Sequence, residues 1–134
     1  MASMLYEMYW ALVDKLGFQP DKHLADLAKG NMLALRLMVE VLKLQPCNPT
    51  FITARNAILQ AEQQLTAGRH QCDLWCAFAK RGLGSNAALD DNDNKRIASN
   101  KVPDKCKTYG VAATEVAVAA VSTNLVACIC ACIQ

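Results

Sequence analysis

The chain has 134 residues, enough for one small domain with a modest core. Its 14 basic and 12 acidic residues are interspersed and give a net charge of +2, so the sequence offers no basic face of the kind that nucleic-acid binding requires. Composition therefore argues against a nucleic-acid partner. Glu7 and Asp14 interrupt the apolar N-terminal run, and we expect no signal peptide within this chain.

Amphipathic helices are predicted along the first 84 residues. The first covers residues 4–16 and ends at Gly17, which favours a left-handed C-terminal cap. A polar connection leads to the second, Gly30 to Leu44, for which Asn31 is the predicted N-cap and Pro46 the stop signal.

The second helix is apolar on almost every side. Its only charged residues, Arg36, Glu40 and Lys43, fall on one narrow stripe. This pattern predicts a central helix whose remaining circumference is covered by other elements.

Two further helices complete the predicted body. The third begins at Pro49 after an Asn48 cap, or else after a Thr50 cap, and ends at Gly68. Its apolar seam is Phe51, Ala54, Ile58, Ala61 and Leu65. The fourth covers residues 73–81, closes at Gly82 and turns Leu74, Trp75 and Phe78 inward.

The sequence thus predicts an all-α fold, a four-helix antiparallel cluster over residues 1–84. Residues 85–108 are polar and mixed in charge, which indicates an irregular extension. Residues 109–134 form an apolar, cysteine-rich tail of uncertain status. The expected core of the helical body is Met32, Leu35, Leu42, Phe51, Ile58, Leu65, Leu74 and Phe78.

The tail has two interpretations. Residues 116–133 reach the minimum length of a membrane span, although alanines and a Ser122, Thr123, Asn124 cluster weaken the pattern. A loosely packed extension is the alternative that we favour.

Candidate metal ligands do not form a recognisable motif. The chain has two histidines, His23 and His70, and neither stands in an HExxH arrangement. His70, Cys72 and Cys76 form an HxCxxxC cluster without an evident fourth ligand, and a core role for Cys76 is the simpler interpretation.

Two other clusters raise the same question. The CICAC run at residues 128–132 offers thiols for a soft metal but has no histidine or acidic partner nearby. The DDNDN run at residues 90–94 lacks the glycine and terminal glutamate of a calcium loop, so a solvated turn is the better interpretation. We predict no catalytic and no metal-binding residue in this chain.

One disulfide is predicted from helix geometry. If the third and fourth helices are antiparallel, the end of the fourth lies near Cys47, and the segment that follows can return Cys106 there. We therefore predict a Cys47–Cys106 pair.

Three stretches carry a family likeness. They are MLYEMYWALVDKLGF, GNMLALRLMVEVLKLQPCNPTFITARNAILQAEQ and CDLWCAFAKRGLG, with a fainter echo in VPDKC at 102–106. In this order and spacing they resemble the C-terminal part of the fungalysins, secreted fungal zinc metallopeptidases of thermolysin-like architecture. The likeness covers about residues 3–84.

The resemblance implies an extracellular peptide-bond hydrolase in which zinc activates water and a glutamate takes its proton. The zinc ligands and the catalytic glutamate belong to family segments that match no position here. The leading hypothesis is therefore a helical part of a secreted metalloendopeptidase, inactive alone, whose partners in the complete enzyme are a catalytic lobe and a peptide substrate. The alternative is a non-catalytic helical interaction protein, tail-anchored through residues 116–133.

Overall fold

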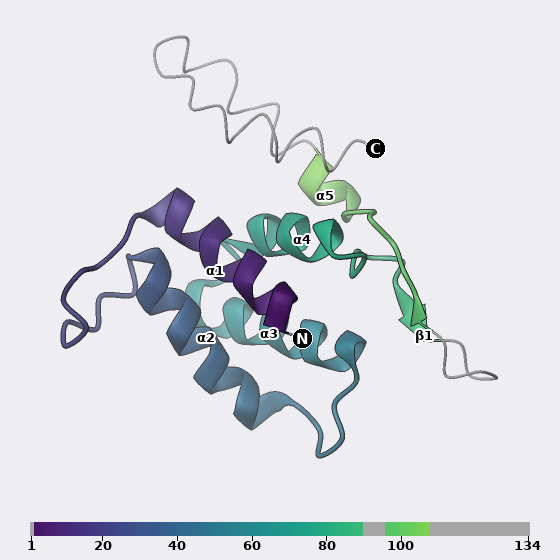
Figure 1. Ribbon diagram of the computed structural model, residues 1–134, viewed down its shortest axis with the longest axis horizontal. Helices are drawn as coiled ribbons and strands as arrows, with labels where there is room; N and C mark the ends of the chain where they lie inside the picture. The colour runs from purple at the N-terminus through teal and green to yellow at the C-terminus, as the bar shows by residue number, and fades with distance from the viewer. Residues whose placement is uncertain (1, 90–95, 108–134) are drawn as a thin grey trace, which may run out of the picture.

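The computed structural model describes residues 2–89 and 96–107, and these are mostly helical, as the all-α prediction requires. Along the described residues, four main helices are followed by a short hairpin and a last helical turn, and Figure 1 shows how they are arranged. The elements are α1 (Ala2–Leu16), α2 (Gly30–Leu44), α3 (Phe51–Thr66), α4 (Gln71–Lys80), β1 (Ala88–Leu89), β2 (Arg96–Ile97) and α5 (Asp104–Lys107).

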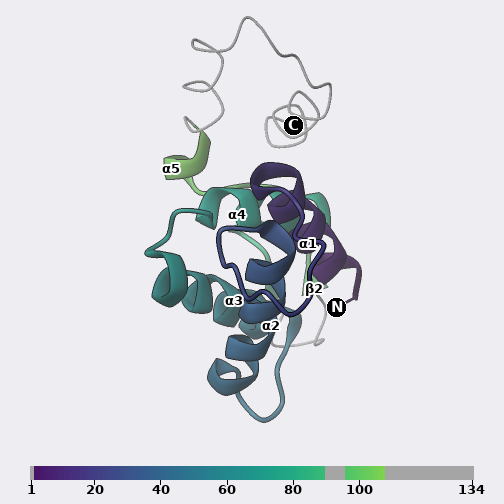
Figure 2. The same cartoon turned by 90° about the vertical axis from the view of Figure 1, so that its left-hand side faces the viewer.

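The helices α1 to α4 enclose one apolar core. Helix α1 packs between α2 and α4, and α3 closes the body against α2 and α4 (Figures 1 and 2). The core side chains that are almost fully buried come from every one of these helices, and the largest are Met4, Met8, Leu12, Leu33, Leu37, Ile58, Leu74 and Phe78. Burial of these side chains is the main favourable contribution to folding of the body.

Glycines set the junction of α1 and α2. Gly17 has a φ of 79°, so the predicted left-handed end of the first helix is confirmed. A Cβ on Gly30 would overlap the backbone of Leu12 and Val13, so only glycine lets the start of α2 approach α1 this closely.

The predicted cap of α2 is wrong. Lys29 occupies the N-cap position without a side-chain cap bond, and Asn31 lies buried inside the helix. Its Oδ1 accepts from the backbone N–H of Gln19 at 2.9 Å and its Nδ2 donates to the Gln19 carbonyl at 2.9 Å. The amide thus anchors the α1–α2 connection, because a buried amide needs both its donor and its acceptor satisfied.

Helix α3 begins with the alternative cap. Thr50 and Thr53 form a reciprocal capping box, in which each side-chain oxygen accepts from the other residue's backbone N–H at 3.1 Å and 2.8 Å. Asn48 and Pro49 therefore lie before the helix.

The expected core is only partly correct. Ile58, Leu74 and Phe78 are buried, and Met32 and Leu65 are partly buried. The expectation is wrong for Leu35, Leu42 and Phe51, which are 51%, 70% and 42% exposed. The described part of the chain leaves one side of α2 uncovered, so α2 is not the fully enclosed helix that its apolar sequence predicted.

The segment after α4, residues 82–89 and 96–107, folds back along that helix and is called the returning segment. Leu83 bridges Ser99, and Ser99 and Lys101 accept backbone N–H bonds from Gly84 and Ser85 at 2.6 Å and 2.7 Å. β1 and β2, which lie between these two stretches in the sequence, form an antiparallel pair. The apolar periodicity of the sequence predicted neither these two strands nor the backbone pairing beside them.

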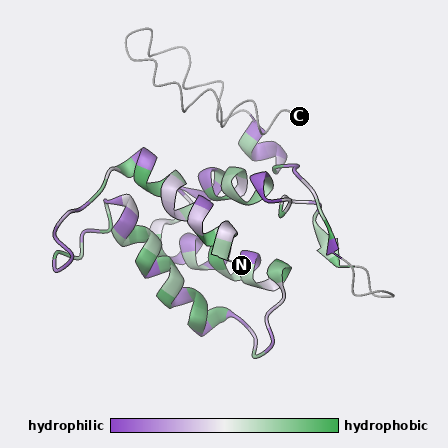
Figure 3. Cartoon of the chain, viewed as in Figure 1, coloured by the Kyte–Doolittle hydropathy of each residue, from purple (hydrophilic) through white to green (hydrophobic). Residues whose placement is uncertain are grey.

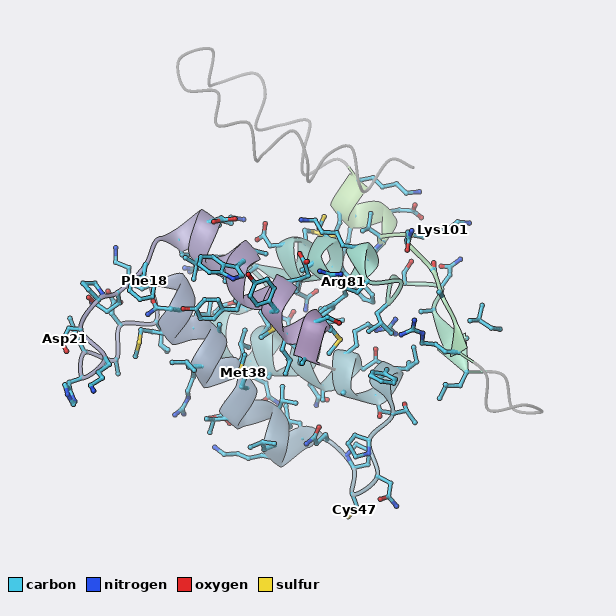
Figure 4. The ribbon with its side chains drawn as sticks, viewed as in Figure 1. Phe18, Asp21, Met38, Cys47, Arg81 and Lys101 are labelled. Carbon is cyan, nitrogen blue, oxygen red and sulfur yellow. A yellow bond between two sulfur atoms is a disulfide. The ribbon has the colours of Figure 1, made fainter. Side chains whose placement is uncertain are left out.

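The predicted Cys47–Cys106 disulfide is wrong. Cys106 is bonded to Cys72 at the start of α4, with a Cα–Cα distance of 5.2 Å. The returning segment runs along α4, so that Val102 and Cys106 form one apolar cluster with Ala79 near the end of the helix and Cys72 near its beginning. Cys47 is an exposed thiol in the α2–α3 loop, at the opposite end of the molecule from α5 (Figure 4).

Several predictions concern residues outside the described ranges. They include the DDNDN run, the CICAC run and the candidate membrane segment at 116–133. Among residues 2–89 and 96–107, no helix has the length and apolarity needed to cross a membrane. The division into a helical body, a polar segment and a tail stays a prediction.

Candidate functional site

The candidate metal ligands do not converge. Cys72 is committed to the disulfide with Cys106, and His23 lies in the exposed α1–α2 connection. The Nδ1 atom of His70 lies 3.7 Å from the Asp73 carboxylate. Within the described part of the chain, no group of three or more His, Cys, Asp or Glu side chains is arranged to hold a metal ion. These residues do not fit a zinc site.

A buried glutamate is the most unusual polar group of the body. Glu62 is fully buried, and its Oε1 accepts from the backbone N–H of His70 at 2.8 Å and from the Thr66 hydroxyl. The carboxylate therefore fastens the α3–α4 turn to α3. Since it has no exposed surface, it cannot contact a substrate. The sequence signals the burial of Glu62 only by its spacing: it stands four residues after Ile58, and positions i and i+4 lie on the same side of a helix.

A buried arginine holds the other end of α4. Arg55 on α3 is 5% exposed, and its Nη1 donates to the carbonyls of Leu83 and Gly84 at 3.2 Å and 2.6 Å. Its guanidinium lies 5.0 Å from the centre of the Trp75 ring. Burial lowers the pKa of Arg55 from its usual range. These contacts fix the turn that starts the returning segment, so Arg55 also has a structural role.

Ion pairs link α1 to α4 at the surface. The Nζ of Lys15 lies 2.7 Å from the Asp73 carboxylate, and Glu7 pairs with Arg81. Both pairs are partly exposed, where each contributes little to stability. They orient the two helices and form no reactive centre.

A shallow polar depression lies beside the returning segment. It has a volume of about 230 Å³ and is lined by Ser85, Asn86, Lys101, Val102, Pro103, Asp104 and Lys107. The Nζ of Lys107 lies 2.6 Å from the Asp104 carboxylate and holds the pKa of that carboxyl below its usual value. The depression contains no nucleophile paired with a base, so it does not have the makings of an active site.

The outer side of α2 is the most distinctive surface feature. Leu35, Val39 and Leu42 are 51%, 51% and 70% exposed and lie on one side of the helix. Figure 3 shows α2 mostly in the green of apolar residues, with purple stretches between them. Sequence analysis found the apolar side chains but assigned Leu35 and Leu42 to the core.

The helical body of the chain matches a known protein family. The family model for fungalysin metallopeptidase (M36) matches residues 1–87, which contain α1 to α4. The chain belongs to the fungalysin family. The resemblance predicted from the three sequence stretches is confirmed.

Curated relatives agree with this assignment. The chain is 44% identical over 110 residues to extracellular metalloproteinase 10 of Coccidioides posadasii, a match covering 79% of this chain and 17% of the relative. It is 47% identical over 106 residues to extracellular metalloproteinase mep of Aspergillus fumigatus, covering 76% of this chain and 16% of the relative. The matches therefore span about one sixth of each relative.

The described residues of this chain do not form the zinc site on which the family's activity depends. Fungalysins are zinc-dependent metallopeptidases, and the relatives are named as extracellular. Glu62, Arg55 and Cys72 each make contacts that hold the helical body or its returning segment.

Proposed function

We propose that this chain serves as a non-catalytic helical part of a secreted, zinc-dependent metalloendopeptidase. The observation that carries the proposal is the family match itself: it falls on the whole helical body and covers about one sixth of a relative. In such an enzyme, zinc-activated water hydrolyses the peptide bond of a protein substrate.

The contacts of the chain's own polar residues support a structural role. The Glu62 carboxylate is enclosed at the α3–α4 turn, and Arg55 is enclosed at the turn after α4. A group that binds substrate or metal needs access to it, and these two groups lack that access. The helical body is thus a scaffold for residues supplied by another part of the enzyme.

The first test is a peptidase assay on the purified full chain with added zinc. We expect no cleavage of casein above the background of a matched mock preparation. Zinc-dependent cleavage that a chelator abolishes would contradict the inactivity of the chain alone.

The second test uses a graft, defined as the Aspergillus fumigatus metalloproteinase in which the matched segment is replaced by this chain. We expect the graft to cleave casein and the relative without the segment to be inactive. An inactive graft would count against the proposal.

An interaction protein anchored through residues 116–133 is the alternative function. It is favoured by the exposed apolar residues of α2 together with the apolar composition of that tail. Membrane association that resists carbonate extraction and disappears when residues 109–134 are deleted would support the alternative over the peptidase scaffold.

A further inference from the structure

Helix α2 carries two separate apolar sides. Leu33, Leu37 and Val41 face the core and are at most 7% exposed. Leu35, Val39 and Leu42, which we call the α2 stripe, succeed one another at intervals of four and three residues on a different side. The stripe covers about two helical turns, or about 10 Å along the axis.

The third side of α2 is polar and satisfied. The Glu40 carboxylate forms ion pairs with Arg36 at 2.8 Å and with Lys43 at 2.9 Å. These two pairs lower the pKa of Glu40, the Lys43 hydrogen bond having the largest effect. The core side of α2 is thus covered by the other helices, and the charged side is paired and faces solvent. The α2 stripe, in contrast, is left exposed by the described residues.

A helix with two apolar sides is typical of an element that packs between two others. Met38, labelled in Figure 4, is partly buried against the core and stands three residues after Leu35 and four before Leu42, the spacing of neighbours on a helix surface. The apolar surface therefore runs from the core boundary onto the stripe. Exposed apolar surface of this continuity marks an interaction site.

The family match indicates what covers this surface. Helix α2 lies wholly within the matched residues 1–87, and about five sixths of each relative lies outside the aligned segment. We propose that the α2 stripe is the docking surface for an amphipathic helix from that remaining part of the fungalysin polypeptide. This inference rests on the proposed function.

The surface defines the chemistry of the docked helix. The stripe holds aliphatic side chains at helical spacing, which accept the apolar ridge of a second helix with an interaxial distance of about 8–10 Å. The side chains of Arg36 and Lys43 are 50% and 62% exposed beside it. Because both cations are already paired with Glu40, the stripe selects its partner by apolar contact, and the docked helix has an uncharged apolar side.

Cysteine labelling measures this cover directly. Leu42→Cys is made in the full chain and in the graft, and its rate of maleimide labelling is read at that residue by mass spectrometry. Ile97→Cys is the control, since Ile97 is likewise exposed, at 51% against 70% for Leu42, and lies outside the family-model match. We expect labelling of Leu42→Cys to be slower in the graft by about tenfold or more, with Ile97→Cys unchanged.

The outcomes separate the docking surface from the proposed function. Equal labelling of Leu42→Cys in the chain and the graft overturns the docking surface, even if the graft cleaves casein. Slow labelling in a graft that does not cleave casein supports the surface and contradicts the proposed function.

Other occupants are also distinguished. Slow labelling in the full chain alone, together with a dimer in sedimentation, would assign the α2 stripe to a second copy and overturn the proposal. Slow labelling in the chain that becomes fast on deleting residues 108–134 would assign it to the tail and overturn it equally.

A charge variant provides a second measurement. Leu42→Lys is expected to change the unfolding midpoint of the full chain by less than about 2 °C and to lower that of the graft by more than about 4 °C. Equal shifts in the two proteins would contradict a docking role for Leu42.

Discussion

The helical body and the described residues of the returning segment, 82–89 and 96–107, are held by different interactions. The body is stabilised by side chains that are removed from water, such as Met8, Leu12 and Phe78. The segment has few buried side chains and is attached by backbone hydrogen bonds, the Arg55 contacts and one disulfide. Cooperative burial therefore governs the body, whereas a small number of individual bonds governs the segment.

The largest effect is expected from emptying the core of the body. Phe78 is fully buried in α4, so Phe78→Ala leaves a cavity and lowers the free energy of unfolding by about 3–5 kcal/mol. Urea unfolding followed by circular dichroism measures this loss. Tyr6→Ala is the control, because Tyr6 is 61% exposed and its removal should have a small effect. Similar losses for the two variants would contradict the assigned core.

The next effect separates the segment from the body. Replacing both Cys72 and Cys106 by serine removes a disulfide with a sequence separation of 34, which typically costs about 2–4 kcal/mol. We expect hydrogen exchange to accelerate in residues 96–107 while α1 to α3 keep their protection. Cys47→Ser, at an exposed thiol, is the matched control and should change neither region. Uniform acceleration throughout the body would show that the two regions are not held separately.

A smaller effect is expected where the two regions meet. Arg55→Met removes the guanidinium donor from the carbonyls of Leu83 and Gly84, of which only Gly84 keeps another among the described residues, the N–H of Ala87, at a cost of about 1–3 kcal/mol. Thermal unfolding should show this loss, and Arg36→Met, at an exposed arginine, should show much less. If both variants unfold at the same temperature, Arg55 does not join the segment to the body.

The smallest effect concerns pH at the end of the segment. Lys107 lowers the pKa of Asp104 below the ordinary value of 3.8, so the pair's contribution is present above that value and is lost as pH falls through the lowered pKa. The protection factor of α5, which corrects hydrogen exchange for its intrinsic pH dependence, should therefore fall slightly at the lowest pH in the unmodified chain. Asp104→Asn should remove this dependence, and a variant with an unchanged profile would contradict the pair.

The contrast between the two regions also explains which features the sequence could predict. Periodic apolar residues such as Ala54 and Ile58 define a helix locally, so the four main helices were predicted close to their observed bounds. The path of the returning segment depends on backbone bonds between distant residues. No periodicity encodes them, and the partner of Cys106 was therefore predicted wrongly.

Polar groups and apolar surfaces were missed for related reasons. Asn31 was predicted as a cap from its residue type, but its partner Gln19 belongs to the preceding connection. The roles of Glu62 and Arg55 likewise depend on the turns at the two ends of α4. For Leu35 and Leu42, the sequence shows an apolar side chain and does not say which element covers it.

The central claim is that this helical body supports fungalysin catalysis without performing it. The most direct measurement is the initial rate of casein hydrolysis by the graft, with and without a chelator, beside the full chain alone. The account predicts chelator-sensitive hydrolysis by the graft and none by the chain. Hydrolysis by the chain alone, or a graft as inactive as the relative without the segment, would contradict it.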